Sequence, residues 1–198
     1  MRISVTRREE QRVGSWAGGT TTQLAIGPEG ADYAARRFEW RISSARVDLD
    51  ESDFTPLPGF QRILMILEGA VHLTHEGIRE VDLGPFEQDS FEGAWKTRSR
   101  GRCVDFNLMT ARGWSGAVAA LSPIPGAPVS VPLAGAIEAF YCLQDAVIVT
   151  IGSAGGGHTE LLDRGDFLLI ESPAPEAVLT VTTREERTAG VHATLTRT

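Results

Sequence analysis

The chain has 198 residues, 42% of them hydrophobic and 23% charged, so it is long enough to bury a core without disulfides or a metal. Its formal net charge is −7 and its pI is near 5.1, which argues against a broad phosphate-binding surface and therefore against nonspecific nucleic-acid binding.

The termini and cysteines predict a cytoplasmic protein with no membrane partner. Met1–Arg8 run straight into charge, unlike a secretion signal, and no apolar run approaches the roughly 20 residues of a membrane helix. Cys103 and Cys142 are the only cysteines and have no metal-finger or CxxC spacing. We expect two buried free thiols.

The first predicted strands lie in the N-terminal quarter. A loop at Trp16–Gly19 leads into a strand at Thr20–Ile26; it is no phosphate loop, because no GK[ST] motif follows. Phe38–Val47 alternates in polarity and predicts a second strand. One face carries Phe38, Trp40 and Ile42, and the other carries Glu39, Arg41, Ser43, Ala45 and Val47. The second face suits either an interior polar wall or an ordinary solvated surface.

A turn at Leu57–Gly59 precedes Arg62 and the apolar run Ile63–Leu67, which stops at Glu68–Gly69 before Val71–His75. This pattern predicts a β-hairpin whose first strand is buried on both faces. Arg62 shares a strand face with Leu64 and Ile66. A guanidinium there must lie at the rim or have an anionic partner, because an unpaired buried charge is costly.

Two further strands are expected at Val81–Phe86 and Cys103–Met109. In the second, Asp105 and Asn107 stand on one side, opposite Phe106 and Leu108. Buried polar groups need partners, so this pair is either functional or tied to a neighbouring loop.

The second half repeats the same outline. A segment rich in Pro, Gly, Ala and Ser, residues 114–136, reads as a connector. After it we expect a hairpin of Phe140–Leu143 with Ala146–Ile151, a loop at Gly155–Gly157, and strands at Leu161–Leu162, Phe167–Ile170, Ala177–Thr182 and Val191–Leu195.

No segment has helical periodicity, so we predict an all-β bicupin, with two β-barrel halves of the double-stranded β-helix or jelly-roll type in one chain. The expected domains are an N-terminal barrel at 1–113, the connector at 114–136 and a C-terminal barrel at 137–198, with the halves packed together.

Metal ligands and catalytic motifs are not evident. His72 and His75 are three residues apart on a strand and therefore point to opposite faces, while His158 and His192 are isolated. No nucleophile elbow or short serine motif occurs. We expect no metal, no cofactor and no catalytic constellation.

An ordered set of segments resembles the HutD/Ves family. It comprises Trp16, Gly18–Leu24, Phe38–Ala45, Phe54, Leu57–Phe60, Arg62, Leu67–Gly69 and Asp105–Met109. The resemblance implies a metal-poor bicupin and, in some members, a sensor or governor of histidine utilisation that binds formylglutamate; other members are described as stress-responsive. This chain lacks the family's Asn after the tryptophan and has Thr22-Gln23 in place of Arg-Glu.

These observations support three hypotheses. The first is a cytoplasmic regulator that binds an acidic metabolite such as formylglutamate. Its candidate ligand-binding residues are Arg62 and Arg41 for carboxylates, Asn107, Ser43 and Thr21 for neutral hydrogen bonds, Trp40 and Phe60 for an apolar wall, and Asp105 beside them. The structural alternative pairs Arg62 with Glu68 or Asp105 inside a barrel.

The second hypothesis is a metal-free isomerase or hydrolase with Asp105 or Glu68 as general base and Arg62 stabilising an oxyanion. The third is a ligand-free interaction scaffold that pairs a barrel edge with a partner or with itself as a homodimer.

Overall fold

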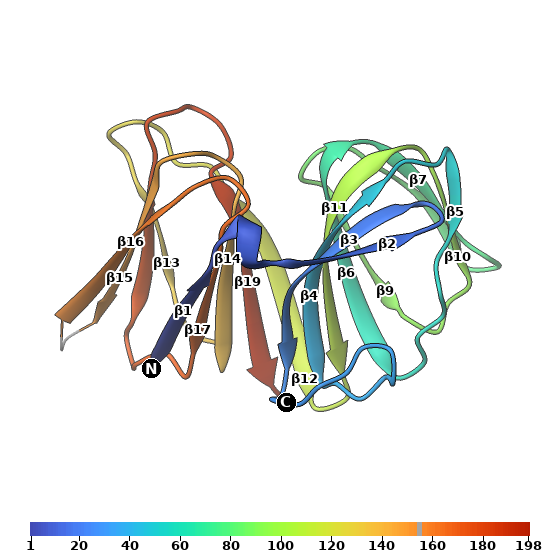
Figure 1. The fold of residues 1–198 in the computed structure, drawn as a ribbon, viewed down its shortest axis with the longest axis horizontal. Coiled ribbons are helices and arrows are strands. Elements are labelled where there is room, and N and C mark those ends of the chain that lie inside the picture. The colour runs from blue at the N-terminus through green and yellow to red at the C-terminus, as the bar shows by residue number, and fades with distance from the viewer. Residues whose placement is uncertain (154–155) are drawn as a thin grey trace. The chain divides into compact units, whose positions relative to one another are not determined.

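The computed structural model describes residues 1–153 and 156–198 and is built from strands, with one short 3-10 helix at Arg8–Glu10 (Figure 1). The strands are β1 (Arg2–Thr6), β2 (Arg12–Trp16), β3 (Gly19–Gly27), β4 (Trp40–Val47), β5 (Glu51–Asp53), β6 (Phe60–Gly69), β7 (Val71–His75), β8 (Arg79–Leu83), β9 (Gln88–Glu92), β10 (Thr97–Arg100), β11 (Cys103–Ala111), β12 (Trp114–Leu121), β13 (Val129–Pro132), β14 (Ile137–Cys142), β15 (Val147–Ser153), β16 (Gly156–Leu162), β17 (Phe167–Glu171), β18 (Val178–Thr182) and β19 (Gly190–Arg197). The described residues form no α-helix, so the all-β prediction is confirmed, and none of them provides a helix able to cross a membrane.

The chain divides into two compact units. The central unit is Gln11–Gly116, and the terminal unit is Met1–Glu10 together with Ala117–Thr198. The first ten residues therefore depart from the expected boundary, because β1 pairs with β17. Residues 114–136 are also not a plain connector, since they contain β12 and β13. β12 is rich in Ala, Gly and Ser, and β13 has only four residues and ends in Pro, so neither shows a strong strand pattern.

Each unit contains two antiparallel sheets. In the central unit the strand orders are β2-β3-β4-β11-β6-β9 and β5-β10-β7-β8. In the terminal unit they are β1-β17-β14-β19-β12 and β13-β18-β15-β16. Within the described residues every sheet ends in two edge strands, so these are open sheets and the expected closed barrels are not formed.

The two predicted hairpins are wrong, although their strands exist. β6 pairs with β11 and β9, whereas β7 pairs with β10 and β8 in the other sheet. Only Ala70 separates β6 from β7, too little for a hairpin loop, so the chain bends and continues into the second sheet. β14 and β15 likewise enter different sheets, and the intervening Gln144 is buried and bonded to Thr183 rather than forming an exposed turn.

Two glycines form the corner between the sheets of the central unit. Gly69 ends β6 with a φ of +80°, and a Cβ there would lie 2.3 Å from the Arg102 carbonyl oxygen. Gly101, between β10 and β11, has a φ of +116°, and its Cβ would lie 2.3 Å from the Ala70 carbonyl oxygen. The two segments that contain these glycines pass from one sheet to the other here, and their backbones lie so close together that only glycine fits.

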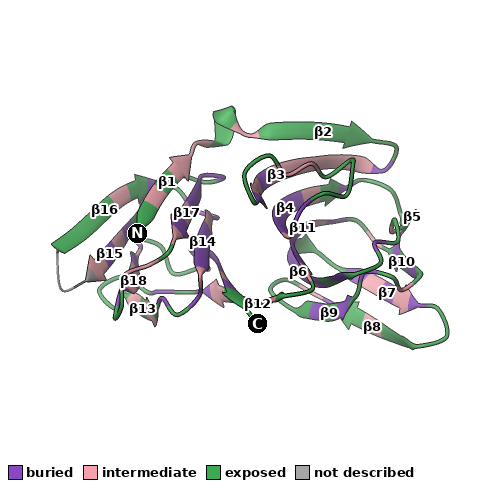
Figure 2. Cartoon of the chain, turned by 90° about the horizontal axis from the view of Figure 1, so that it is seen from below, coloured by how far each residue is buried: buried purple, intermediate pink, exposed green. Residues whose placement is uncertain are grey.

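Apolar side chains fill one end of the space between these sheets. The cluster is Val47, Leu64, Ile66, Val71, Leu73, Leu83, Phe91 and Cys103. Residues Leu64–Leu67 are all buried, so the two-faced burial predicted for this strand is confirmed. Cys103 and Cys142 are buried and free, as predicted. The edge strand β2, by contrast, is exposed along its whole length (Figure 2).

The corner makes a stability prediction. Gly69→Ala introduces both a positive φ and a clash with the Arg102 carbonyl, so we expect a loss of about 3 kcal/mol or more in the free energy of unfolding, measured by urea denaturation. Gly77→Ala is the matched control: its φ is +73°, but nothing lies within 4 Å, so only about 1 kcal/mol should be lost. Equal losses in the two variants would contradict the close corner.

A candidate anion-binding pocket in the central unit

The register of three adjacent strands builds a polar floor in the central unit. β11 lies between β4 and β6. Asn107 is paired with Ser43 on β4 and Leu64 on β6. Side chains alternate between the two faces of a strand, so a residue two positions away points to the same side. The row with Met109 at its centre therefore also faces this side.

The Met109 row carries the two cations. Arg41 pairs with Met109 from β4, and Arg62 pairs with it from β6. Two strand spacings place their Cα atoms roughly 10 Å apart. The row on the other side of Asn107 contains Ala45 and Asp105.

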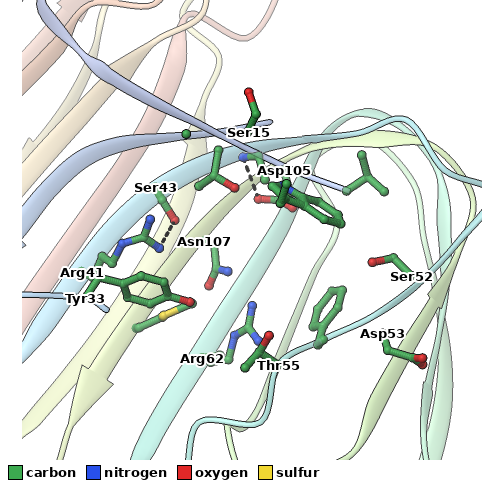
Figure 3. Close-up of a pocket in the computed structure, with 17 residues that line it drawn as sticks. Ser15, Tyr33, Arg41, Ser43, Ser52, Asp53, Thr55, Arg62, Asp105 and Asn107 are labelled. Atoms are coloured by element: carbon green, nitrogen blue, oxygen red, sulfur yellow. Dashed lines mark hydrogen bonds between the residues drawn. The ribbon is translucent and has the colours of Figure 1, made fainter. Parts of the chain in front are cut away.

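These rows form the floor of a pocket of about 450 Å³ (Figure 3). It is lined by Gly14, Ser15, Trp16, Thr21, Tyr33, Arg41, Ser43, Ala45, Val47, Ser52, Asp53, Phe54, Thr55, Arg62, Asp105, Asn107 and Met109. Its volume is in the range of sites that hold small metabolites. All lining residues belong to the central unit.

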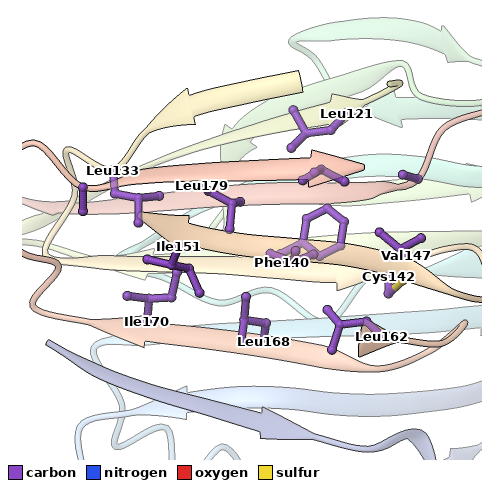
Figure 4. Close-up of a cluster of buried hydrophobic side chains, with 14 residues drawn as sticks. Leu121, Leu133, Phe140, Cys142, Val147, Ile151, Leu162, Leu168, Ile170 and Leu179 are labelled. Atoms are coloured by element: carbon purple, nitrogen blue, oxygen red, sulfur yellow. The ribbon is translucent and has the colours of Figure 1, made fainter. Parts of the chain in front are cut away.

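The interior of the terminal unit is different. Its sheets enclose a large apolar cluster that includes Phe140, Ile151, Leu162 and Leu168 (Figure 4). Because apolar side chains fill this interior, the pocket of the central unit is the better candidate for a ligand-binding site.

Arg62 is the central feature of the pocket. It is 8% exposed, and its Nε has no hydrogen-bond partner among the residues that the structure describes. Its guanidinium carbon lies 4.8 Å from the ring centre of Phe54 and 5.2 Å from that of Phe91, so aromatic faces support the cation without neutralising it. Burial lowers the pKa of Arg62, and the charge of Asp105 opposes that shift.

Arg41 is held more firmly. Its Nη1 donates to Ser43 Oγ at 2.9 Å, and its Nε donates to Gln23 Oε1 at 3.3 Å. Its guanidinium carbon lies 4.1 Å from the ring centre of Tyr33. These partners are neutral groups, and burial lowers the pKa of Arg41 as well.

Asp105 and Asn107 complete the floor. Asp105 is 5% exposed; its Oδ1 accepts one hydrogen bond from the Ala45 N–H at 3.2 Å. Burial raises the pKa of Asp105 to about 7, although the Ala45 N–H and the two arginines oppose the shift. Asn107 is 7% exposed, and within the described part of the chain its Oδ1 accepts no hydrogen bond. Figure 3 shows its amide between the two guanidinium groups.

The pocket gathers six of the eight candidate residues predicted from the sequence: Thr21, Arg41, Ser43, Arg62, Asp105 and Asn107. Trp40 and Phe60 do not line it. Trp40 lies on the opposite face of β4, where a Cβ on Gly27 would meet its ring at 2.3 Å. Phe60 stacks on Phe38, with ring centres 4.3 Å apart, in a separate apolar cluster.

Sequence reasoning missed several walls of the pocket. The missed residues are Trp16 from β2, Asp53 from β5, and Tyr33 and Phe54 from loops. These segments lack a clear strand pattern in the sequence. Phe54 was part of the family-like motif, but only the cation–π contact reveals its role.

Two structural alternatives are corrected by the geometry. The solvated-face interpretation of β4 is wrong, because Arg41 and Ser43 are buried. Arg62 forms no hydrogen bond through its Nε among residues 1–153 and 156–198, and Asp105 acts on it through its charge rather than as a bonded partner.

The histidines do not assemble a metal centre in the part of the chain that the structure describes. His75 is buried, and its two ring nitrogens bond Thr97 Oγ1 at 2.8 Å and Asp89 Oδ2 at 2.7 Å. His72, on the other face of β7, contacts Asp82 Oδ1 at 2.8 Å.

An unpaired buried arginine predicts an unusual response to mutation. Replacing Arg62 with Met removes a desolvated charge and keeps the side-chain volume, so we expect the ligand-free protein to unfold within about 1 kcal/mol of wild type, or to be more stable. Arg79→Met is the control, because Arg79 bonds the buried Asp89, and its removal should cost about 1–3 kcal/mol. Urea denaturation measures both; an equal loss would reveal an internal partner for Arg62.

The pKa of Asp105 predicts a pH dependence of stability. Its folded-state pKa of about 7 lies above the ordinary 3.8, so its contribution to stability is complete below about pH 4 and is lost as pH rises through 7. Asp105→Asn should therefore gain about 2–3 kcal/mol relative to wild type between pH 5 and pH 8 in urea denaturation. Asp53→Asn, at an exposed pocket residue paired with Arg98, should show no such gain. A pH-independent difference for Asp105→Asn would contradict the raised pKa.

Comparison with known proteins identifies the family. A model of the HutD family matches residues 8–189. HutD from Pseudomonas fluorescens SBW25, solved in a formate condition, is 22% identical over 100% of both chains, with a TM-score of 0.79. PA5104 from Pseudomonas aeruginosa PAO1, a conserved protein of unknown function, is 23% identical over 99% of this chain and 100% of its own, with a TM-score of 0.84.

A more distant likeness concerns the fold alone. The bacterial pirin YhhW from Escherichia coli, in complex with nickel(II), is 10% identical over 99% of both chains, with a TM-score of 0.67, and supports a cupin-like all-β fold. No curated protein matches the sequence. Because the family model spans nearly the whole chain, this protein belongs to the HutD family.

Proposed function

We propose that this HutD family protein binds a small dicarboxylate metabolite in the pocket of the central unit and serves as a sensor or regulator in histidine utilisation, with formylglutamate as the leading ligand. The observation that carries the proposal is Arg62, a buried cation whose Nε lacks a partner and which lines an open pocket. Desolvating an ion costs several kcal/mol, and an anionic ligand would offset that cost.

The two arginines of the pocket supply the charges that a dicarboxylate needs. Arg41 and Arg62 approach from strands on either side of β11, so each can hold one carboxylate through its planar donor fork. Asn107 Oδ1 lies between them and needs a donor. The formamide N–H of formylglutamate, attached to the carbon that bears one of its carboxylates, would supply it.

The lining favours binding over catalysis. Its hydroxyl groups come from Ser, Thr and Tyr residues, but no His or Lys is among the described lining residues to activate them. The role in histidine utilisation rests on the family resemblance. We also propose that the two units are the halves of a bicupin, and that the protein acts in the cytoplasm, where two free buried thiols would stay reduced.

A metal-free enzyme is the second candidate, and one observation favours it. Asp105 has a pKa of about 7, near the value best suited to a general base, and shares the pocket with two arginines that could stabilise an oxyanion. Mass spectrometry of formylglutamate incubated with the protein tests this: a product that disappears with Asp105→Asn would establish turnover.

Ligand binding is tested by thermal unfolding and calorimetry with formylglutamate, glutamate, urocanate, histidine and plain dicarboxylates. At 100 times its Kd, a ligand that binds only the native state should add about 2.7 kcal/mol of stability. We expect this for formylglutamate, and we expect Arg62→Met to weaken its binding about 100-fold or more by removing a charge-assisted pair in a desolvated site.

Arg98→Met provides the matched control. Arg98 is an exposed cation that pairs with Asp53 at the pocket, so its removal should change affinity less than about threefold. If no carboxylate binds, or if Arg62→Met binds as wild type does, the proposal is overturned.

A further inference from the structure

We propose that Asp105 couples ligand binding to proton uptake, so that the pocket takes up one proton from solvent on the Asp105 carboxylate when it binds a dianion. This inference rests on the proposed function and adds a specificity-determining role for a residue that does not itself pair with the ligand's carboxylates. It predicts that the affinity of the pocket for a dianion depends on pH as well as on the shape of the ligand.

Asp105 lies in the pocket beside two arginines but is not bonded to them. Its carboxyl is buried on the pocket floor, where Oδ1 accepts a hydrogen bond from the Ala45 N–H at 3.2 Å. Among the described residues, neither Arg41 nor Arg62 forms an ion pair with it. The carboxylate therefore shares a cavity with two cations without being bound to either.

The groups that face Asp105 set the charge balance. Arg41 projects from β4 and Arg62 from β6, and both favour its ionised form. On β11 itself, Cys103 lies two residues away on the same face, and burial together with the Asp105 charge raises the pKa of that thiol to about 12, so it stays neutral. Tyr33 covers Arg41 through its ring.

The opposite wall adds little charge. Asp53 is the other lining carboxylate. Its ion pair with Arg98, at 2.9 Å, lowers the pKa of Asp53, so it stays ionised and its negative charge is balanced by Arg98. Thr21, from β3, contributes a hydroxyl group. The pocket therefore holds two cations and a single titrating carboxyl.

A dianion completes the charge balance only when Asp105 is neutral. With Asp105 protonated, the two guanidinium groups match two ligand carboxylates. With Asp105 ionised, a third carboxylate lies in the same desolvated site, and like charges there disfavour ionisation. The raised pKa of about 7 means that the proton is available near neutral pH at small cost.

Proton balance gives the expected magnitude. The bound dianion raises the Asp105 pKa further, so above pH 7 each binding event transfers one proton from the buffer to a carboxylate oxygen of Asp105. Affinity for the dianion should then fall about tenfold between pH 6 and pH 8, because the Asp105 of the free protein, with its pKa of about 7, changes from mostly protonated to mostly ionised over this range.

The experiment is isothermal titration calorimetry at pH 6 and pH 8, in pairs of buffers with different ionisation heats, with formylglutamate and with glutarate as probes. Both acids are ionised over most of this range, so proton uptake reports on the protein. We expect roughly 0.5–1 proton taken up per ligand at pH 8 and about 0.1 at pH 6. Asp105→Asn should bind with no proton uptake and with a Kd that changes less than about twofold between the two pH values.

Asp53→Asn is the matched control, since it removes the other lining carboxylate and should keep the wild-type proton uptake. Binding without proton uptake at pH 8, or uptake that persists in Asp105→Asn, overturns the inference and leaves the proposed function standing. If neither probe binds at either pH, the proposed function fails and this inference fails with it.

Discussion

A buried positive charge whose Nε bonds no described residue is the constraint on which the pocket depends. Arg62 stands on a strand face that continues into the apolar core at Leu64 and Ile66. Its Nε has no partner among the described residues, and the rings of Phe54 and Phe91 lie against its guanidinium. Aromatic faces offset part of the desolvation cost but cannot accept a hydrogen bond in the plane of the guanidinium from Nε. A fold selected for stability alone would replace such a residue with an apolar one, so its presence points to a ligand.

The fold makes that arrangement possible by bending two strand pairs at one corner. The β6–β7 and β10–β11 segments pass from one sheet to the other at Gly69 and Gly101, where backbone approaches backbone too closely for any side chain. Beyond the corner, β11 lies between β4 and β6, and their shared face changes from apolar to polar within a few residues. The same register that packs the core thus aligns the residues of the pocket.

The sequence alone could predict the strands and most of the floor, but not the walls. Alternation in β4 and β11 grouped Arg41 with Ser43 and Asp105 with Asn107, and these groupings are confirmed. Trp40 was misassigned although alternation already placed it on the face of the strand opposite Arg41 and Ser43, where it could not share their pocket. The hairpins failed for a different reason: adjacent strands were assumed to pair, whereas a one-residue link bends between sheets. Tyr33 and Phe54 lie in irregular segments, where position depends on contacts distant in sequence.

The most direct test of the central claim is a crystal structure of the protein with formylglutamate. The account predicts one ligand carboxylate within about 2.7–2.9 Å of Arg62 Nε or its neighbouring donors, the second at Arg41, and an N–H directed at Asn107 Oδ1. A ligand bound elsewhere, with Arg62 still unpaired, would contradict the claim that the anion completes this pocket.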